Sequence, residues 1–406
     1  MKREVGDSMS AGGSSRSART ERQRGQVLVV GVLVMLGLIA MAALVVEGGN
    51  AFAQQRATQN GADAAANAGA VVLAQRLGGA PKTDADVAAA VSSIATANGI
   101  TSQTAHYTDV EGRALDSSGA LASVSGNPPA AVGGNTIPPN AQGVAVGATK
   151  SFGTYLAGAL GMTSFDASAE ATARTGRLVG GPFLPVIFPV SITDCDGNGT
   201  LPPFEQNQWL ESEPPATLGG YPDGPEYIVP LCKTFGPGAG SGGSFQILDL
   251  DPDLDCEEEA ANPPAIEWQV FPVWVDVDNG NNCARPIADV VNSSLRLTPL
   301  LIPICDTGSG SAIGCESQGH GSGGQYHVMG VAAFYIDWMY DQNGGANDPH
   351  CQEAFSSTSG QPLTNVIGGN GSSSCVQGWF INFITNGPVG SGPVGDGEAI
   401  GVQLIR

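Results

Sequence analysis

The chain has 406 residues, which is enough for more than one domain and for a buried core. Its formal net charge of −21 disfavours nucleic acid and anionic lipid headgroups as binding partners, because both are negatively charged. Glycine occupies 58 positions, about twice its usual share, and this favours loops and sheets over long soluble helices.

The N-terminal residues end in a segment typical of a membrane anchor. Residues 27–46, VLVVGVLVMLGLIAMAALVV, are 20 consecutive uncharged residues, and a helix of that length crosses ~30 Å of hydrocarbon. Arginines precede the run and Glu47 follows it, so the positive-inside rule places the N-terminus in the cytoplasm. A cleavable signal peptide is the alternative, with AFA at 51–53 as its cleavage site, but the run is longer than an ordinary signal sequence. We expect a retained anchor.

Helix-forming residues continue beyond the anchor to Leu77, and GGAP at 78–81 ends them. The small side chains of residues 50–70 favour close packing against other helices. The alternative is that this alanine-rich sequence is only a good helix former. Thr83 can cap a second helix that closes at Asn98-Gly99.

The next segments predict a small mixed module. Residues 115–140 are rich in Gly, Pro and Ser and predict a long hairpin tip or a linker. Apolar spacing then predicts a strand over 143–150, a helix over 152–160 and a strand over 165–173.

Residues 24–70 contain four short motifs: Arg24-Gly25-Gln26, Glu47-Gly48-Gly49, Gln54-Gln55-Arg56 and Gln59-Asn60-Gly61-Ala62-Asp63-Ala64-Ala65-Ala66. Through these motifs the segment resembles the N-terminal segment of TadE/TadG-like proteins of the Tad (Flp) pilus machinery, and residues 143–175 are also similar to the next segment of proteins in that family. The resemblance implies a membrane-anchored protein whose partners are other envelope or pilus-assembly proteins. One feature departs from prepilins, which carry Glu five residues after the cleaved glycine. Here Val30 is the fifth residue after Gly25, and this favours a stable anchor.

Residues 180–406 predict a β-rich exported domain. All eight cysteines lie here, and an even number confined to an exported region predicts disulfides, although the sequence does not choose the pairing. Candidate strands cover 182–192, 266–277, 294–305, 326–340 and 376–384. The acidic run at 248–259 is expected to be a solvated surface. The cysteines are Cys195, Cys232, Cys256, Cys283, Cys305, Cys315, Cys351 and Cys375.

One loop in this region, DCDGNGTLPPFE at 194–205, matches the pattern of a calcium-binding loop. Carboxylate and amide oxygens on alternate residues, a glycine at the turn and a final carboxylate suit a hard cation. Its candidate ligands are Asp194, Asp196, Asn198, Thr200 through its carbonyl, and Glu205. A simple turn between a strand and a helix is the alternative.

An enzymatic alternative comes from Asp306-Thr307-Gly308-Ser309, which follows an apolar strand as in a half-site of a retropepsin-like aspartic peptidase. The later NVIGGN at 365–370 resembles a second element of such enzymes. That chemistry needs two carboxylates that share a proton, so a single motif would require a symmetric dimer. The ordinary interpretation is the end of a strand and a turn.

The sequence therefore predicts an α+β protein with a disordered cytoplasmic tail at 1–25, a transmembrane anchor at 26–47, an extracytoplasmic module at 48–179 and a disulfide-bonded β-rich domain at 180–406. Its expected function is structural or accessory, in Tad/Flp-type pilus assembly or in the cell envelope. We expect no catalysis and no required cofactor, with calcium as an optional ligand. A calcium-stabilised surface binding or adhesion module is the second interpretation, and the peptidase is the third.

Overall fold

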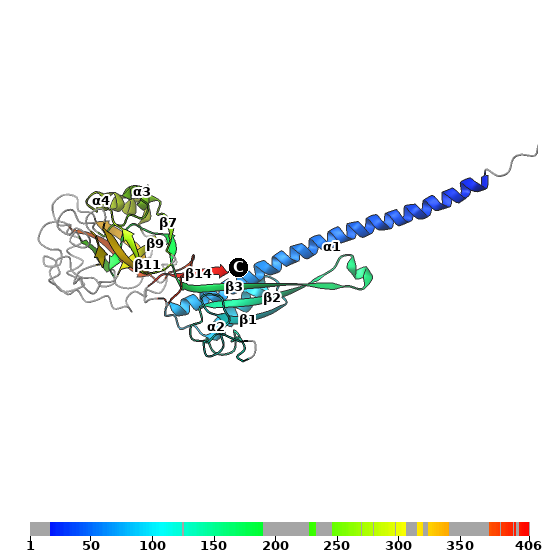
Figure 1. The fold of residues 1–406 in the computed structure, drawn as a ribbon, viewed down its shortest axis with the longest axis horizontal. Coiled ribbons are helices and arrows are strands. Elements are labelled where there is room, and N and C mark those ends of the chain that lie inside the picture. Colours follow the sequence, from blue (N-terminus) through cyan, green and yellow to red (C-terminus); the bar gives the residue numbers. More distant parts are fainter. Residues whose placement is uncertain are drawn as a thin grey trace, which may run out of the picture.

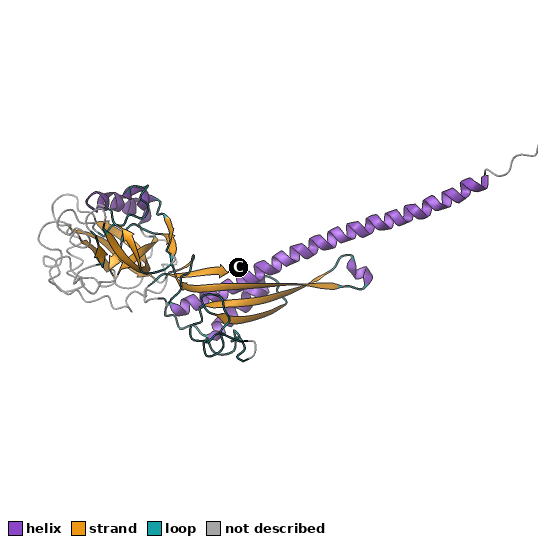
Figure 2. Ribbon diagram, in the orientation of Figure 1, coloured by secondary structure: helices purple, strands orange, loops and turns teal. Residues whose placement is uncertain are grey.

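The computed structural model describes residues 17–123, 126–189, 227–232, 246–268, 270–278, 280–296, 298–305, 315–319, 324–340, 373–381, 383–392, 394 and 398–405. The molecule is elongated, with helix α1 running from one end to a sheet in the middle (Figure 1). A second sheet with two short helices lies at the other end (Figure 2). The α+β class predicted from the sequence is confirmed.

Two helices open the fold. Helix α1 (Ser17–Leu77) is continuous over 61 residues and ends where GGAP predicts. Helix α2 (Asp84–Ala97) begins with a capping box, in which the side chain of Thr83 accepts from the N–H of Asp86 and the Asp86 carboxylate accepts from the N–H of Thr83. Both predictions are confirmed.

The first sheet has five strands in the order β1-β2-β3-β14-β13, and only β13 and β14 are parallel. Alanines alternate along β3 as predicted, and their side chains join those of α1 and α2 in one core. Residues 109–142 connect β1 to its antiparallel partner β2, so the predicted hairpin is confirmed. The strands are β1 (Ser102–Thr108), β2 (Gly143–Gly153), β3 (Ser164–Arg177), β13 (Ile384–Asn386) and β14 (Ile400–Ile405).

The helix predicted over 152–160 is wrong. Strand β2 continues to Gly153, where Phe152 lies opposite Phe165 of β3 with 6.3 Å between the ring centroids. Only the short 3-10 turn η1 (Ala157–Leu160) remains, and it ends at Gly161 with φ of 88°. The apolar spacing suited a helix, but the cross-strand pairing of the two aromatic rings extends the hairpin and leaves room for one turn.

The second sheet has the order β5-β9-β11-β12-β6, and β8 and β10 also pair with β11. Strands β9 and β11 are buried on both faces, which explains their continuous apolar sequence. The bounds are β5 (Phe188–Pro189), β6 (Tyr227–Cys232), β8 (Val273–Asp276), β9 (Pro299–Cys305), β10 (Ser317–Gln318), β11 (Gln325–Tyr340) and β12 (Ser373–Ile381). A separate pair joins β4 (Gly180–Pro182) to β7 (Ala265–Glu267).

Two helices that the sequence analysis missed pack near this sheet. Helix α3 (Cys256–Ala261) begins within the acidic run and ends just after it, and α4 (Gly280–Val290) continues into a single π turn, Val291–Leu295. The strand predicted over 294–305 consequently begins only at Pro299.

The two sheets share the chain in an unexpected way. Strand β3 leads from the first sheet toward β4 and the second, whereas β13 and β14 return from the second to the first. The predicted boundary between residues 179 and 180 remains a prediction, but the first sheet contains strands from both sides of it.

Candidate functional site

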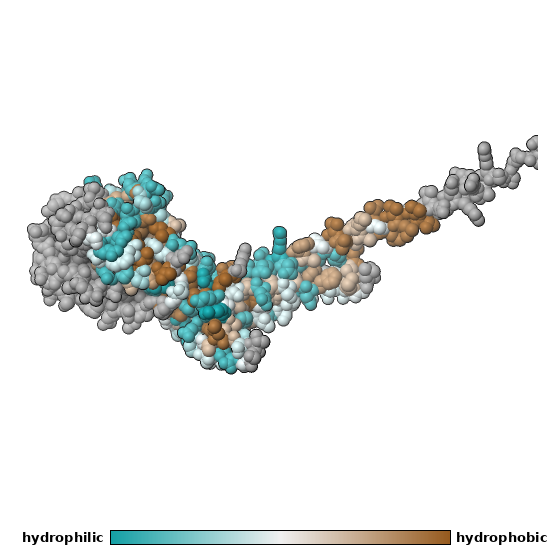
Figure 3. Space-filling model, viewed as in Figure 1, coloured by the Kyte–Doolittle hydropathy of each residue, from teal (hydrophilic) through white to brown (hydrophobic). Residues whose placement is uncertain are grey.

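The surroundings of helix α1 differ along its length. The large apolar side chains of residues 28–46 are all exposed, from 49% at Val46 to 75% at Leu44. The most apolar 18-residue window has a mean hydropathy of 3.0 and none of it is buried, so within the described chain this is the one helix long and apolar enough to cross a membrane. Figure 3 shows this part of the helix as an isolated apolar rod that leads away from the folded body.

The small-residue face of α1 lies where the helix joins the fold. Ala62, Ala65, Ala66 and Ala70 are fully buried against α2 and the first sheet. A Cβ atom on Gly69 would lie only 2.8 Å from Cγ2 of Val91 in α2 and 3.2 Å from Val144 in β2. The small side chains therefore serve contact with the sheet as well as with a second helix.

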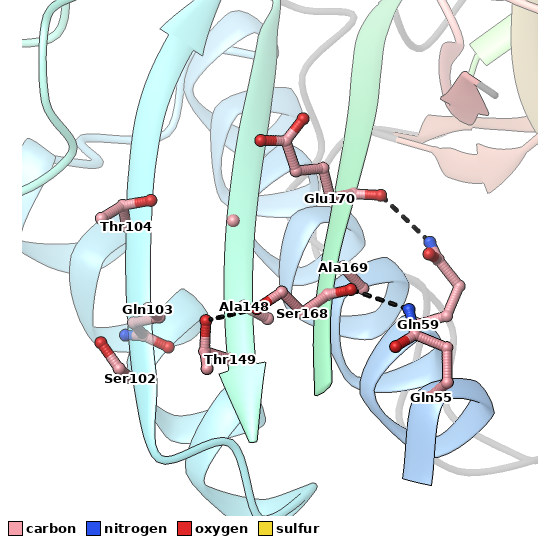
Figure 4. A pocket seen from close by; sticks show the side chains of 11 residues that line it. Gln55, Gln59, Ser102, Gln103, Thr104, Ala148, Thr149, Ser168, Ala169 and Glu170 are labelled. Carbon is pink, nitrogen blue, oxygen red and sulfur yellow. Dashed lines mark hydrogen bonds between the residues drawn. The ribbon is translucent and has the colours of Figure 1, made fainter. Parts of the chain in front are cut away.

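Two glutamines of α1 cover an edge of the first sheet. Strand β14 pairs with β3 only over residues 172–177, and no other described strand pairs with the preceding part of that edge of β3. Gln55 donates to the carbonyl oxygen of Ser168 at 2.7 Å, and Gln59 donates to that of Glu170 at 3.1 Å (Figure 4). The side chains satisfy the acceptors that another strand would otherwise use.

Beside these glutamines lies a shallow polar groove of about 610 Å³. Hydroxyl, amide and carboxylate groups from α1 and from β1, β2 and β3 line it (Figure 4). Such groups can hydrogen-bond to a polar surface. Among these lining residues, no nucleophile is hydrogen-bonded to a base. Its polar residues include Gln55, Gln59, Ser102, Thr104, Thr149 and Glu170.

A third contact joins α1 to the tip of the β2–β3 hairpin. The Glu47 carboxylate accepts hydrogen bonds from the N–H groups of Leu156 and Ala157, at 2.7 and 2.8 Å from Oε1. Glu47 is the first residue after the apolar run. The end of that run is therefore tied to the folded sheet.

Comparison with known proteins addresses this same part of the chain. Residues 25–72 match the family model of putative Flp pilus-assembly TadE/G-like proteins. The resemblance predicted from the N-terminal motifs is thus confirmed for this TadE/G-like segment, residues 25–72. No curated protein and no solved structure matches the chain.

The TadE/G-like segment contains the apolar run, Glu47, both edge-covering glutamines and most of the small-residue face. Its sequence motifs therefore correspond to the three contacts that fix α1 to the sheet. Sequence reasoning found these residues through the resemblance, but it did not show that Gln55 and Gln59 reach strand β3.

Outside the TadE/G-like segment, the described residues contain two disulfides. Cys256–Cys283 joins α3 to α4, and Cys305–Cys315 follows β9, with Cα–Cα distances of 5.5 and 5.3 Å. Cys195 and Cys351 lie outside the described residues, and Cys232 and Cys375 lie in the neighbouring strands β6 and β12. That all eight cysteines are oxidised stays a prediction.

The predicted calcium loop, with Asp194, Asp196, Asn198, Thr200 and Glu205, lies outside the described residues, as do Asp306-Thr307-Gly308-Ser309 and residues 365–370. Among the residues that the structure describes, one group of metal-ligating type is Cys256, Asp278 and Cys283. Its two sulfurs are joined to each other, so they are not thiolate ligands.

The acidic run at 248–259 is not wholly the solvated surface expected from the sequence. Glu259 is only 1% exposed, and its Oε1 accepts from the N–H groups of Leu250 and Asp251 at 2.9 and 2.5 Å. Burial raises the pKa of Glu259 to about 7. The carboxylate closes the turn before α3, a role that its charge-rich neighbours conceal in the sequence.

Proposed function

We propose that the protein is a membrane-anchored structural or accessory component of Tad/Flp-type pilus assembly, with residues 48–406 outside the cytoplasm. The match of residues 25–72 supports a pilus-assembly-related envelope protein. The arginines before the apolar run support an N-terminus inside the cell.

The observation that carries the proposal is the continuity of α1. One helix of about 90 Å, at 1.5 Å per residue, contains both the exposed apolar run and the small-residue face that is buried against the first sheet. No linker separates the apolar run from the fold, because Glu47, Gln55 and Gln59 all contact the sheet or its hairpin. Such a protein holds its outer domain at a fixed position relative to the membrane, which suits a structural role.

The polar groove supports a non-catalytic role. Its hydroxyl and amide groups and the carboxylate of Glu170 can bind another polypeptide through hydrogen bonds. We infer that other envelope or pilus-assembly proteins are the partners, and we expect no reaction at this groove.

Topology and assembly can be tested separately. Protease added to intact spheroplasts should digest the outer domains and leave a membrane-embedded stub, whereas a soluble form starting near Gln54 would contradict the anchor. Deletion of the gene should reduce surface pili, and the full chain should restore them. Glu170→Lys reverses a charge in the lining of the groove and should restore fewer pili, and Lys82→Ala, which removes a charge away from that lining, is its control.

If Glu170→Lys restores pili as well as Lys82→Ala does, the groove is not the assembly surface. If the deletion strain assembles normal pili, the pilus role itself is excluded. Both variants must reach the membrane in equal amounts for the comparison to hold, and immunoblotting of membrane fractions measures this.

A further inference from the structure

The tip of the β2–β3 hairpin lies beside the C-terminal end of the apolar run, where Glu47 follows residue 46. The hairpin extends along α1 toward its N-terminal half (Figure 1). Besides the Glu47 contact with Leu156 and Ala157, Asn50 donates to the carbonyl of Gly153 at 3.4 Å. Two points of α1, less than one helical turn apart, therefore hold the tip level with the end of the span.

The tip exposes several large apolar side chains. Tyr155 is 71% exposed, and Phe52 on the neighbouring turns of α1 is 76% exposed. No charged residue occurs between Ser151 and Phe165. We call the exposed residues Phe52, Tyr155, Leu156, Met162 and Phe165 the collar.

The backbone of the tip is largely hydrogen-bonded within itself. Thr154 donates its N–H to the carbonyl of Thr163 at 3.2 Å and its hydroxyl to that of Met162 at 2.6 Å. Met162 donates to Ala157, and Glu47 accepts from the two N–H groups at the start of the turn. Backbone groups that are satisfied in this way can enter an environment with little water at low cost.

We propose that the collar lies in the headgroup layer of the same bilayer that α1 crosses, so that the protein contacts the membrane at two places. This inference rests on the proposed function in one respect, that α1 spans a membrane. The bilayer is the expected occupant because Glu47, the first residue after the apolar run, and Asn50 hold the tip beside the end of that run.

The chemistry of the collar fits this location. Tyrosine is favoured at the membrane–water interface, where its apolar ring and its hydroxyl both find matching surroundings. Phenylalanine and leucine are typical of the apolar face of interfacial segments. The uncharged tip neither needs nor repels anionic lipid, in contrast to the strongly acidic chain as a whole. A second contact beside a single helix would limit its tilt and rotation and so orient the outer domain.

Photo-cross-linking of the full chain in vesicles tests the proposal. The photoreactive residue p-benzoylphenylalanine replaces Tyr155, Leu36 within the apolar run, or Leu121, which is 52% exposed in the connection between β1 and β2. The vesicles contain phosphatidylcholine alone or a three-to-one mixture with phosphatidylglycerol. Mass spectrometry then distinguishes lipid adducts from adducts with another copy of the chain.

We expect lipid adducts at positions 36 and 155 in both vesicles, with a severalfold lower yield at position 121. Lipid adducts at position 36 but not at position 155 would contradict the proposed location of the collar and would leave the membrane anchor supported. Absence of adducts at both positions would overturn the anchor as well. Protein adducts at 155 in place of lipid adducts would identify the collar as an interface between copies and contradict the proposal.

The contact at Glu47 provides a second test. Glu47→Ala removes the acceptor for the N–H groups of Leu156 and Ala157, so the lipid yield at position 155 should fall severalfold while that at position 36 is unchanged. Glu47→Gln keeps a carbonyl acceptor and should restore most of the yield. An unchanged yield in Glu47→Ala would show that Glu47 does not position the tip.

Discussion

The guanidinium of Arg177 pairs with the carboxylate of Glu398, which lies 221 residues later in the chain. Arg177 ends β3 in the first sheet, and it also donates to the carbonyl of Met329 in β11 at 2.7 Å. Its guanidinium lies 4.9 Å from the ring centroid of Phe271. One side chain thus joins the first sheet, the second sheet and the segment that returns to β14.

This position makes Arg177→Ala a test of how the sheets are coupled. The side chains of Arg177 and Glu398 are only 16% and 7% exposed, so removal of one partner leaves a buried charge. We expect a loss of about 3–5 kcal/mol in the free energy of unfolding, measured by urea titration of the full chain in detergent. Glu111→Ala, which breaks an exposed pair with Arg113 (side chains 50% and 58% exposed), should cost at most about 1 kcal/mol. Equal effects of the two variants would show that Arg177 does not couple the sheets.

Two glycines of α1 give opposite predictions for the same substitution. Gly69→Ala places a methyl group 2.8 Å from Val91, whereas nothing lies within 4 Å of the new methyl in Gly49→Ala. We expect Gly69→Ala to lose about 1–3 kcal/mol through overpacking. Gly49→Ala should gain up to about 1 kcal/mol through helix propensity. Thermal melting of both variants measures the difference, and a stabilised Gly69→Ala would show that α2 can move aside.

Much of the N-terminal fold could be predicted because its determinants are local. The capping box at Thr83, the glycines after Leu77 and the alternating alanines of β3 each act within a few residues. The returning strand β14 could not be predicted in this way. Its partner on β3, residues 172–177, lies more than 200 residues earlier, and no local pattern encodes that pairing.

The candidate site likewise contains residues that the sequence identifies and contacts that depend on the tertiary fold. The resemblance identified Glu47, Gln55 and Gln59, but their partners at Leu156, Ser168 and Glu170 depend on the tertiary arrangement. Glu259 was concealed because an acidic run usually belongs to the surface, and only its burial at the turn before α3 distinguishes it.

Glu259 predicts a dependence of stability on pH. Its pKa is raised by burial from 4.5 to about 7, so between these values the folded state binds more protons than the unfolded state. The folded state therefore gains stability as the pH falls from about 7 toward 4.5, and it carries the full penalty above about 7. Burial also raises the pKa of Asp249, which acts in the same direction.

The measurement compares melting at pH 8 and pH 5.5. Glu259→Gln keeps an acceptor for Leu250 and Asp251 but cannot ionise, so its melting temperature should change less between the two pH values than that of the wild type. Glu111→Gln, at an exposed position, is the matched control and should retain the wild-type dependence. If Glu259→Gln retains it as well, another group is responsible.

The disulfide between α3 and α4 should contribute more to stability than the one after β9. Cys256 and Cys283 are 27 residues apart, whereas Cys305 and Cys315 are 10 apart, and a longer loop loses more entropy when it is closed in the unfolded chain. Replacing both members of the first pair by serine should cost about 2–5 kcal/mol, and the second pair should cost less. Urea titration of the two double variants compares them, and the reverse order would contradict the loop-closure explanation.

Calcium binding at 194–205 is the last prediction, and it stands on the sequence of the loop alone. We expect Asp194, Asp196 and Asn198 to supply alternate oxygen ligands and Glu205 to supply the final carboxylate. With affinity typical of extracellular modules, a Kd of about 10⁻⁴–10⁻³ M, millimolar calcium should raise the melting temperature by a few degrees relative to chelator.

The Glu205→Gln variant tests whether the loop is responsible for that shift. It removes a carboxylate that can bind calcium through both oxygens, so the rise in melting temperature should disappear. Glu111→Gln removes a carboxylate from an exposed position outside the loop and should preserve the rise. If calcium leaves the wild type unchanged, or shifts Glu205→Gln equally, the segment is a turn and calcium has no part in the stability of this domain.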